Sequence, residues 1–164
     1  MILTACTTIC VKRLASRWLL VWLCLWTVVG IAQPASARTD ALPTITLTIG
    51  EHRIAAEVAT TPEQRSTGLM NRFSLRPDTG MIFVFPRAEP QGFWMKNTYV
   101  PLSIAFIDGE GRIVNIEDMT PLTETTHWSR GPAQFALEMR KGWFREHGVG
   151  AGERVGGLPK SSGQ

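Results

Sequence analysis

Cysteine is almost absent from this sequence, and it occurs only near the N-terminus. The 164-residue chain has three cysteines, and none lies beyond residue 37. They are Cys6, Cys10 and Cys24. Residues 38–164 therefore have no side chain for a disulfide or for a thiolate metal site. That part of the chain must be stabilised by its own packed core.

Acidic side chains are missing from residues 1–37. Three cations precede an apolar run, and small residues follow it, which is the three-part pattern of a cleavable secretory signal. The apolar run is shorter than the roughly 20 residues that a spanning helix needs. We therefore expect a periplasmic or secreted protein that meets a membrane only through the signal before cleavage; the alternative is an uncleaved signal that anchors it. The pattern consists of Lys12, Arg13 and Arg17, the run Trp18 to Ala32, and Ala35-Ser36-Ala37.

An excess of positive charge is also missing once residues 1–37 are set aside. They hold three of the 17 basic residues and none of the 14 acidic ones, so residues 38–164 have 14 of each. Without a basic stripe to hold phosphates, we expect no nucleic-acid partner. The length of residues 38–164 suits one domain with one core.

Signatures of catalysis are likewise lacking. The sequence has no Gly-x-Ser-x-Gly elbow and no His-x-x-x-His pair. Glu117 and Asp118 are neighbours on a predicted strand, so their side chains point to opposite faces and cannot act as a dyad. The sequence therefore assigns no catalytic residue, no metal ligand and no cofactor.

The first half of the domain predicts strands around one short helix. Hydroxyl and branched apolar side chains alternate over residues 44–49, and the alternation returns over 54–58, which indicates an opening hairpin. Residues 61–64 have the capping-box pattern of a short helix that ends near Gly68. The apolar run 81–85 predicts a strand buried on both faces and closed by the next residue, Pro86.

The second half predicts further strands. A hairpin over residues 102–107 and 112–119 has its turn at 108–111, and a long loop over 120–132 holds His127 and Trp128. Alternation over 134–139 predicts a half-buried strand, helical turns follow over 142–148, and a last short strand near 153–155 closes the sheet. The expected fold class is mainly β (α+β): a small, largely antiparallel β-barrel or rolled sheet with one or two short helices. The expected organisation is a polar lead over 38–43, a single domain over 44–155 and a flexible tail over 156–164.

Several blocks of the sequence form a recognisable set: Thr61 to Met70, Gly80 to Phe85, Phe93 to Thr98, Pro101-Leu102, Phe106 to Asp108, Gly131 to Ala133, Leu137-Glu138 and Gly142-Trp143. Together they resemble the domain of unknown function 192 family. The resemblance covers about residues 45–155, and the Trp94-to-Thr98 block is the most distinctive. It implies a small β-rich domain, often behind an export signal, without an established activity. Where relatives usually have Pro-Leu-Asp, this chain has Ser103 in place of the acid.

Five polar residues are candidates for a ligand site. Lys96, Asn97 and Thr98 follow an apolar segment and suit an anionic or polyhydroxylated ligand, or they form a tight turn. Arg65 and Glu138 either line a shared cleft or form a salt bridge.

Three functions remain open from the sequence. The first is a non-catalytic binding or accessory protein of the cell envelope, for a small polar or anionic ligand or an envelope component. The second is an envelope hydrolase in which Glu138 or Asp118 acts as acid or base. The third is copper(I) binding by methionine and tryptophan, although methionine is also a common filler of cores.

Overall fold

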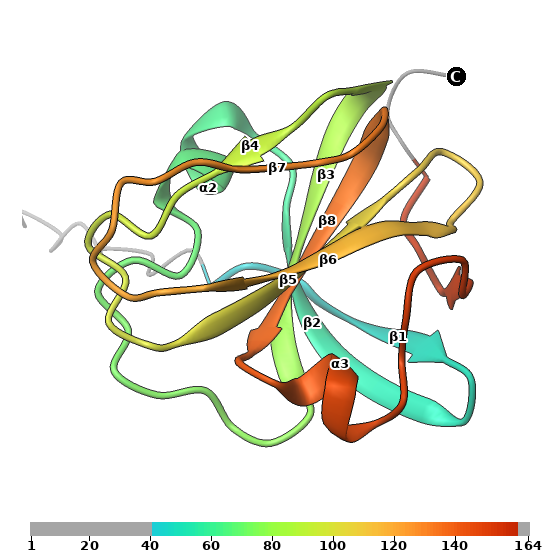
Figure 1. The fold of residues 1–164 in the computed structure, drawn as a ribbon, viewed down its shortest axis with the longest axis horizontal. Helices are drawn as coiled ribbons and strands as arrows, with labels where there is room; N and C mark the ends of the chain where they lie inside the picture. Colours follow the sequence, from blue (N-terminus) through green and yellow to red (C-terminus); the bar gives the residue numbers. More distant parts are fainter. Residues whose placement is uncertain (1–40, 161–164) are drawn as a thin grey trace, which may run out of the picture. The chain divides into compact units, whose positions relative to one another are not determined.

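The structure is a computed structural model that describes residues 41–160, and within them it is mostly β with two short helices (Figure 1). The predicted fold class is therefore confirmed. The predicted signal and the ends of the chain lie outside the described residues. The elements are β1 (Thr44–Ile49), β2 (His52–Ala59), α2 (Pro62–Thr67), β3 (Thr79–Glu89), β4 (Gly92–Phe93), β5 (Leu102–Ile107), β6 (Ile113–Met119), β7 (His127–Trp128), β8 (Ala133–Arg140), α3 (Trp143–Glu146) and β9 (Val155–Gly156).

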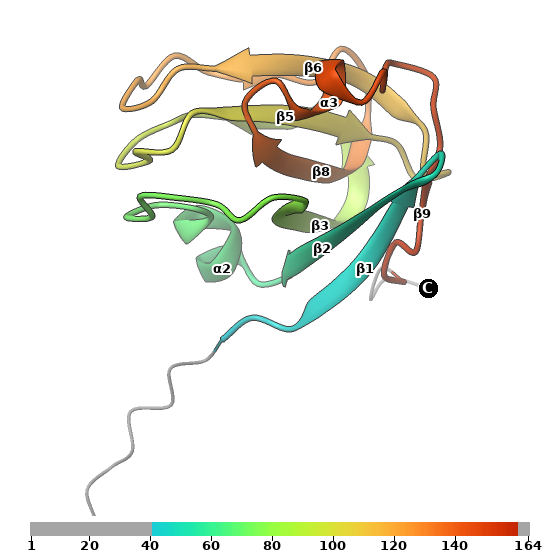
Figure 2. The ribbon, with the colours of Figure 1, turned by 90° about the horizontal axis from the view of Figure 1, so that it is seen from below.

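Seven strands form one strongly curled sheet in the order β6-β5-β8-β3-β2-β1-β9, as Figure 2 shows from the side. All neighbours in it are antiparallel except β2 and β3, which are parallel because α2 carries the chain back to the same end. The N–H of Val155, in β9 beside β1, donates to the carbonyl of Gly111, just before β6, at 2.8 Å. This bond joins the two edges of the sheet at one end, as expected for a rolled sheet.

The short helix α2 begins and ends as its sequence predicts. The Gln64 N–H donates to the Thr61 hydroxyl at 3.2 Å, and the Gln64 side-chain oxygen accepts from the Thr61 N–H at 3.0 Å. Gly68 ends the helix with a φ of 47°, a conformation that favours glycine. Both signals act locally, so the sequence alone is sufficient to predict where this helix begins and ends along the chain.

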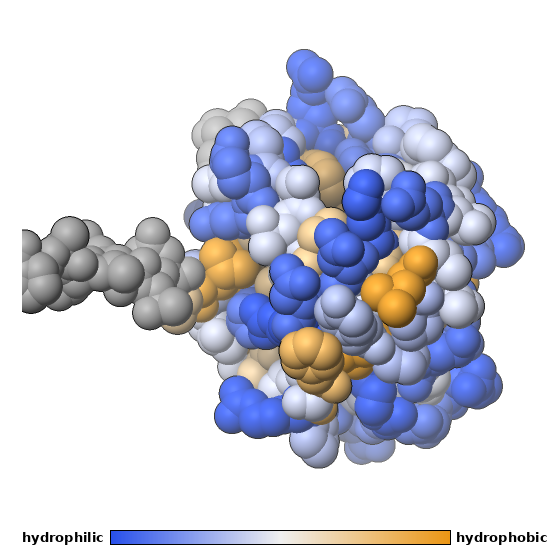
Figure 3. Space-filling view, turned by 90° about the vertical axis from the view of Figure 1, so that its left-hand side faces the viewer, coloured by the Kyte–Doolittle hydropathy of each residue, from blue (hydrophilic) through white to orange (hydrophobic). Residues whose placement is uncertain are grey.

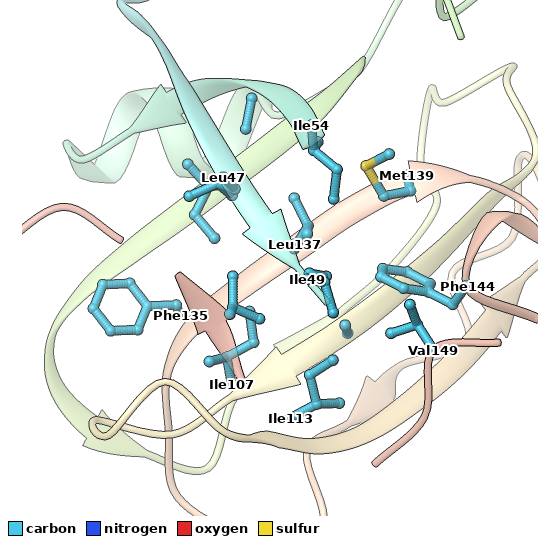
Figure 4. Packing of buried hydrophobic residues seen from close by; sticks show 14 of the residues in the cluster. Leu47, Ile49, Ile54, Ile107, Ile113, Phe135, Leu137, Met139, Phe144 and Val149 are labelled. Carbon is cyan, nitrogen blue, oxygen red and sulfur yellow. The ribbon is translucent and has the colours of Figure 1, made fainter. Parts of the chain in front are cut away.

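Two apolar clusters cover the faces of the central strands. The first fills the inside of the curl with residues such as Leu47, Leu137 and Phe144 (Figure 4). The second packs Phe83 and Phe106 beneath the segments that follow α2 and β4. Since β3, β5 and β8 contribute to both clusters, these strands are buried on both faces.

Three local predictions are wrong. Strand β8 is not half-buried: Ala136 and Glu138 are buried along with the apolar residues, because β3 and β5 flank it and the second cluster covers its other face. The loop over 120–132 contains β7, which pairs with β4. Strand β3 continues through Pro86 to Glu89, because the β3–β8 register shifts there and the missing N–H is not needed in the ladder.

Ser103 is a buried residue of β5 that connects three elements. Its hydroxyl donates to the carboxylate of Asp118 on β6 and accepts the Gly142 N–H at the start of α3 at 2.9 Å. We expect Ser103→Ala to lower the free energy of unfolding by about 1–2 kcal/mol, because a buried N–H and a carboxylate lose their partner. Urea unfolding measures the loss. Ser74→Ala, the same change at an exposed position, is the control, and equal stability of the two variants would contradict the role of Ser103.

Candidate functional site

A pocket of about 290 Å³ lies where α2 and the turn after it face β3, β4 and β8. Arg65 and Thr67 come from α2, Phe83 from β3, Phe93 from β4 and Glu138 from β8. Figure 3 shows the side of the molecule that carries α2, β4 and β7 in Figure 1, where apolar patches lie among polar side chains. The pocket is near the lower end of the ~300–1,000 Å³ range of ligand sites, so it suits a compact ligand.

Glu138 is the main polar group of the pocket. It lies in the middle of the sheet with Met81 and Ile104 as its cross-strand partners, and it is only 4% exposed. Burial raises the pKa of its carboxyl to about 8, and no described group forms a salt bridge or hydrogen bond with the carboxyl. Near neutral pH the carboxyl is therefore mostly protonated, and it can both donate and accept a hydrogen bond.

Arg65 lies at the edge of the same pocket, and its position is fixed. One guanidinium nitrogen donates to the carbonyl of Val84 at 3.0 Å and also to that of Thr60. The guanidinium carbon lies 5.1 Å from the centre of the Phe85 ring. Among the described residues Arg65 and Glu138 form no ion pair, so the structure has the shared-cleft arrangement and not the salt bridge.

The segment Lys96 to Thr98 is a turn, and only Thr98 lines the pocket. Asn97 has a φ of 53°, a left-handed conformation that asparagine tolerates well, and its carbonyl accepts the Asn71 N–H at 2.9 Å. The buried Thr98 hydroxyl donates to the Lys96 carbonyl at 3.2 Å. Lys96 is exposed and lies 3.6 Å from a Glu124 carboxylate oxygen.

The two acids proposed for hydrolysis lie in different places. Asp118 borders another cavity, where it contacts Ser103 and lies 3.5 Å from an Arg145 nitrogen. Glu138 is the only acidic residue among the described residues that line its pocket. An acid–base pair across one cleft, which glycoside hydrolysis uses, is therefore not formed by these two carboxyl groups.

The methionines proposed for copper are divided between the two clusters. Met139 packs in the first, and Met81, Met95 and Met119 pack in the second, all four fully buried. Met70 alone lines the pocket. Within residues 41–160 no group of three histidine or acidic side chains is placed to hold a metal ion.

Four aromatic residues of the pocket were not among the five candidates for the ligand site, although tryptophan was considered for copper. They are Phe83, Phe85, Phe93 and Trp94. Phe83 and Phe85 are two residues apart on one strand, so their side chains share a face, and that spacing was the available signal. Their shared pocket depends on the position of β4, which no sequence pattern indicates.

The fold and the pocket define a class: a small domain built on one strongly curled, mostly antiparallel sheet, with a ligand-sized pocket beside its short helix. The model of the DUF192 family, described as Uncharacterized ACR, matches residues 45–157, and the chain belongs to this family. Within residues 41–160 no helix is long and apolar enough to cross a membrane.

Two crystal structures share the fold at substantial sequence identity. A protein from Sinorhizobium meliloti 1021, provisionally described as a transcription regulator, is 36% identical with a TM-score of 0.64. The match covers 74% of this chain and 94% of that one. A protein of unknown function from Novosphingobium aromaticivorans DSM 12444 is 32% identical with a TM-score of 0.65, over 76% and 93% of the two chains. A search of curated proteins found no match.

Proposed function

We propose that this protein is an exported, non-catalytic domain that binds a small polar ligand in the Glu138 pocket. The observation that carries the proposal is a carboxyl that is buried, has no described hydrogen-bond partner and lines a ligand-sized pocket. Removing a carboxyl from bulk water in this way costs free energy, and strongly desolvated carboxyl groups that line a pocket are often functional.

The neighbours of Glu138 support binding more than catalysis. The Thr98 hydroxyl and the Arg65 guanidinium add polar groups, while phenylalanine rings form much of the wall. A few polar groups on an aromatic wall are typical of ligand pockets. A hydrolase needs a second acid or a nucleophile activated by a base. The described lining of this pocket has no second acid, and no hydroxyl in it is hydrogen-bonded to Glu138.

Export is supported by residues 1–37 alone. Cations, an apolar run and small residues follow one another there, and acidic residues are absent. We infer a periplasmic or secreted protein. Expression of the full chain in a bacterial host is then expected to give a product in the periplasm or medium that begins at Arg38, as measured by intact mass. A product that keeps residues 1–37 in the membrane fraction would instead indicate the anchored form.

Ligand binding is tested by a thermal-shift screen of that product against neutral sugars, amines, carboxylates and metal ions. A ligand at about 100 times its Kd adds close to 3 kcal/mol to the free energy of unfolding, which raises Tm by several degrees. We expect one class to do so, and we expect Thr98→Val to weaken its binding about tenfold through the lost hydroxyl.

Thr125→Val is the matched control, because Thr125 is exposed and lies outside the pocket lining. It should leave the Kd unchanged. If none of the four classes shifts Tm, or if Thr98→Val and Thr125→Val behave alike, the pocket is not the binding site.

A further inference from the structure

The aromatic wall of the pocket runs from its floor to its mouth. Phe83 is buried, and its ring lies edge-to-face with that of Phe93, at 4.9 Å between ring centres. Trp94 lines the same pocket and is 49% exposed. Such packed rings are rigid, and they favour a ligand that offers an apolar face.

Polar groups in the pocket supply both hydrogen-bond donors and acceptors. The protonated Glu138 carboxyl has one of each, and the Thr98 oxygen, which donates to a backbone carbonyl, can still accept. Arg65 bonds to backbone carbonyls through one nitrogen, and its other N–H groups make no hydrogen bond to described residues. Neighbouring hydroxyl groups on a ligand would match this mixture, because each hydroxyl donates and accepts.

Charge on the ligand would be unfavourable in either sign. A cation would enter beside Arg65, 5.1 Å from the Phe85 ring, and Lys96, whose ammonium lies 5.5 Å from the Trp94 ring. These two cations would repel a cationic ligand that approached the same rings, whereas an uncharged ligand meets no such repulsion. An anion could pair with Arg65 at the edge of the pocket, but two donors of that guanidinium are already bound to backbone carbonyls. Seated beside Glu138, the anion would lose its hydration without a second cation, since only burial shifts the pKa of that carboxyl.

A second indole lies next to the mouth. Trp128 on β7 pairs with Gly92, and a Cβ added to Gly92 would lie 2.9 Å from the Trp128 ring. Gly92 itself lines the pocket, and Trp128 is 59% exposed. One exposed indole, Trp94, therefore lines the pocket of about 290 Å³, and a second, Trp128, lies beside the lining residue Gly92. This arrangement suits a compact unit held inside and further apolar faces outside.

We infer that the ligand is an uncharged saccharide, one pyranose ring of which enters the pocket, with its apolar face on the aromatic wall and its hydroxyls on Glu138 and Thr98. This inference rests on the proposed function and names the class of ligand for the same pocket.

The test is a binding titration of the protein obtained by expressing the full chain. The protein is titrated with glucose, galactose, mannose and N-acetylglucosamine, and binding is monitored by tryptophan fluorescence. Choline and succinate serve as cationic and anionic probes. We expect saturable binding of at least one sugar, and at least about tenfold weaker binding in Trp94→Ala, because the stacking surface is lost. Phe73→Ala is the matched aromatic control, since Phe73 is 81% exposed and does not line the pocket.

Substitutions of Glu138 separate the ligand classes. Glu138→Gln keeps a donor and an acceptor, so sugar binding should survive there and fall at least about tenfold in Glu138→Leu. A cationic ligand requires the ionised carboxyl and would be lost in both variants.

One outcome is that choline or succinate binds, that no sugar binds and that Glu138→Leu abolishes the binding. This outcome would overturn the saccharide inference but would still support the pocket as the binding site. Binding of none of these probes would overturn the saccharide inference, and the broader thermal-shift screen then decides the proposed function by itself. Circular dichroism confirms that each variant is folded.

Discussion

Glu138→Gln is expected to make the protein more stable, and the gain should grow with pH. The folded state holds the Glu138 proton with a pKa of about 8, raised by burial from the ordinary 4.5. A raised pKa means that the unfolded chain releases this proton first. The contribution of the Glu138 carboxyl to the free energy of unfolding is therefore greatest below about pH 4.5. It falls between about pH 4.5 and 8 and is constant above that range.

The size of the gain follows from the same linkage. Each pH unit in that range costs the wild-type protein about 1.4 kcal/mol, so the amide should add roughly 4 kcal/mol near pH 8 and almost nothing near pH 4.5. Denaturant unfolding across this pH range, with both proteins measured side by side, gives the difference directly.

Glu51→Gln is the control, because Glu51 is exposed in the turn between β1 and β2. Its stability should follow that of the wild-type protein at every pH. Glu57 acts in the opposite direction, because its hydrogen bond to Arg72 lowers its pKa. Its contribution to stability is present above about pH 4.5 and is lost as the pH falls below that value. Both proteins keep that pair, so it cancels in the comparison. A stability difference between Glu138→Gln and wild type that does not change with pH would show that Glu138 is not buried as described.

Gly80→Ala is expected to be strongly destabilising. Gly80 pairs with Met139 on β8, and a Cβ at Gly80 would lie 2.3 Å from the Glu138 carbonyl oxygen and 2.5 Å from the Met139 sulfur. The oxygen belongs to the backbone of a central strand, so it cannot move without disturbing the sheet. We expect a loss of roughly 3 kcal/mol in the free energy of unfolding, with a matching fall in Tm.

Gly150→Ala provides the matched control for that prediction. A Cβ at Gly150 would meet no heavy atom within 4 Å, and its φ is not in the left-handed region. Its effect should stay within about 0.5 kcal/mol. Similar stabilities for the two alanine variants would mean that β3 and β8 do not approach each other this closely.

Prediction from the sequence succeeded for α2 and β1, where a local signal was sufficient. The capping box at Thr61 and Gln64 fixed the start of α2, and alternation over 44–49 fixed a strand. It failed for β8, because alternation over 134–139 predicted a half-buried strand, whereas Ala136 and Glu138 on the second face are buried as well. Alternation reports which residues share a face, but it does not report what covers that face.

The candidate site was predictable only in part. Arg65, Thr98 and Glu138 were singled out as polar residues in suggestive places, and the structure brings these three to one pocket. Lys96 and Asn97 lie outside the pocket lining, because the turn that buries Thr98 directs its neighbours elsewhere. The role of Lys96 and Asn97 in ligand binding stays a prediction. Substitutions of these two residues, measured beside the pocket variants, would test it.

Composition, hydrophobic period and turn residues were sufficient to predict a β-rich domain without cysteine over residues 38–164, because each acts over a few neighbouring residues or is read directly from the sequence. The DUF192 family was indicated separately, by the resemblance of several sequence blocks to that family. The tertiary structure alone decided that β2 and β3 run parallel, that β8 lies at the centre of the sheet and that an aromatic wall encloses the Glu138 carboxyl. These features depend on contacts between residues far apart in the chain. Burial, and with it the raised pKa of Glu138, exists only once those contacts have formed.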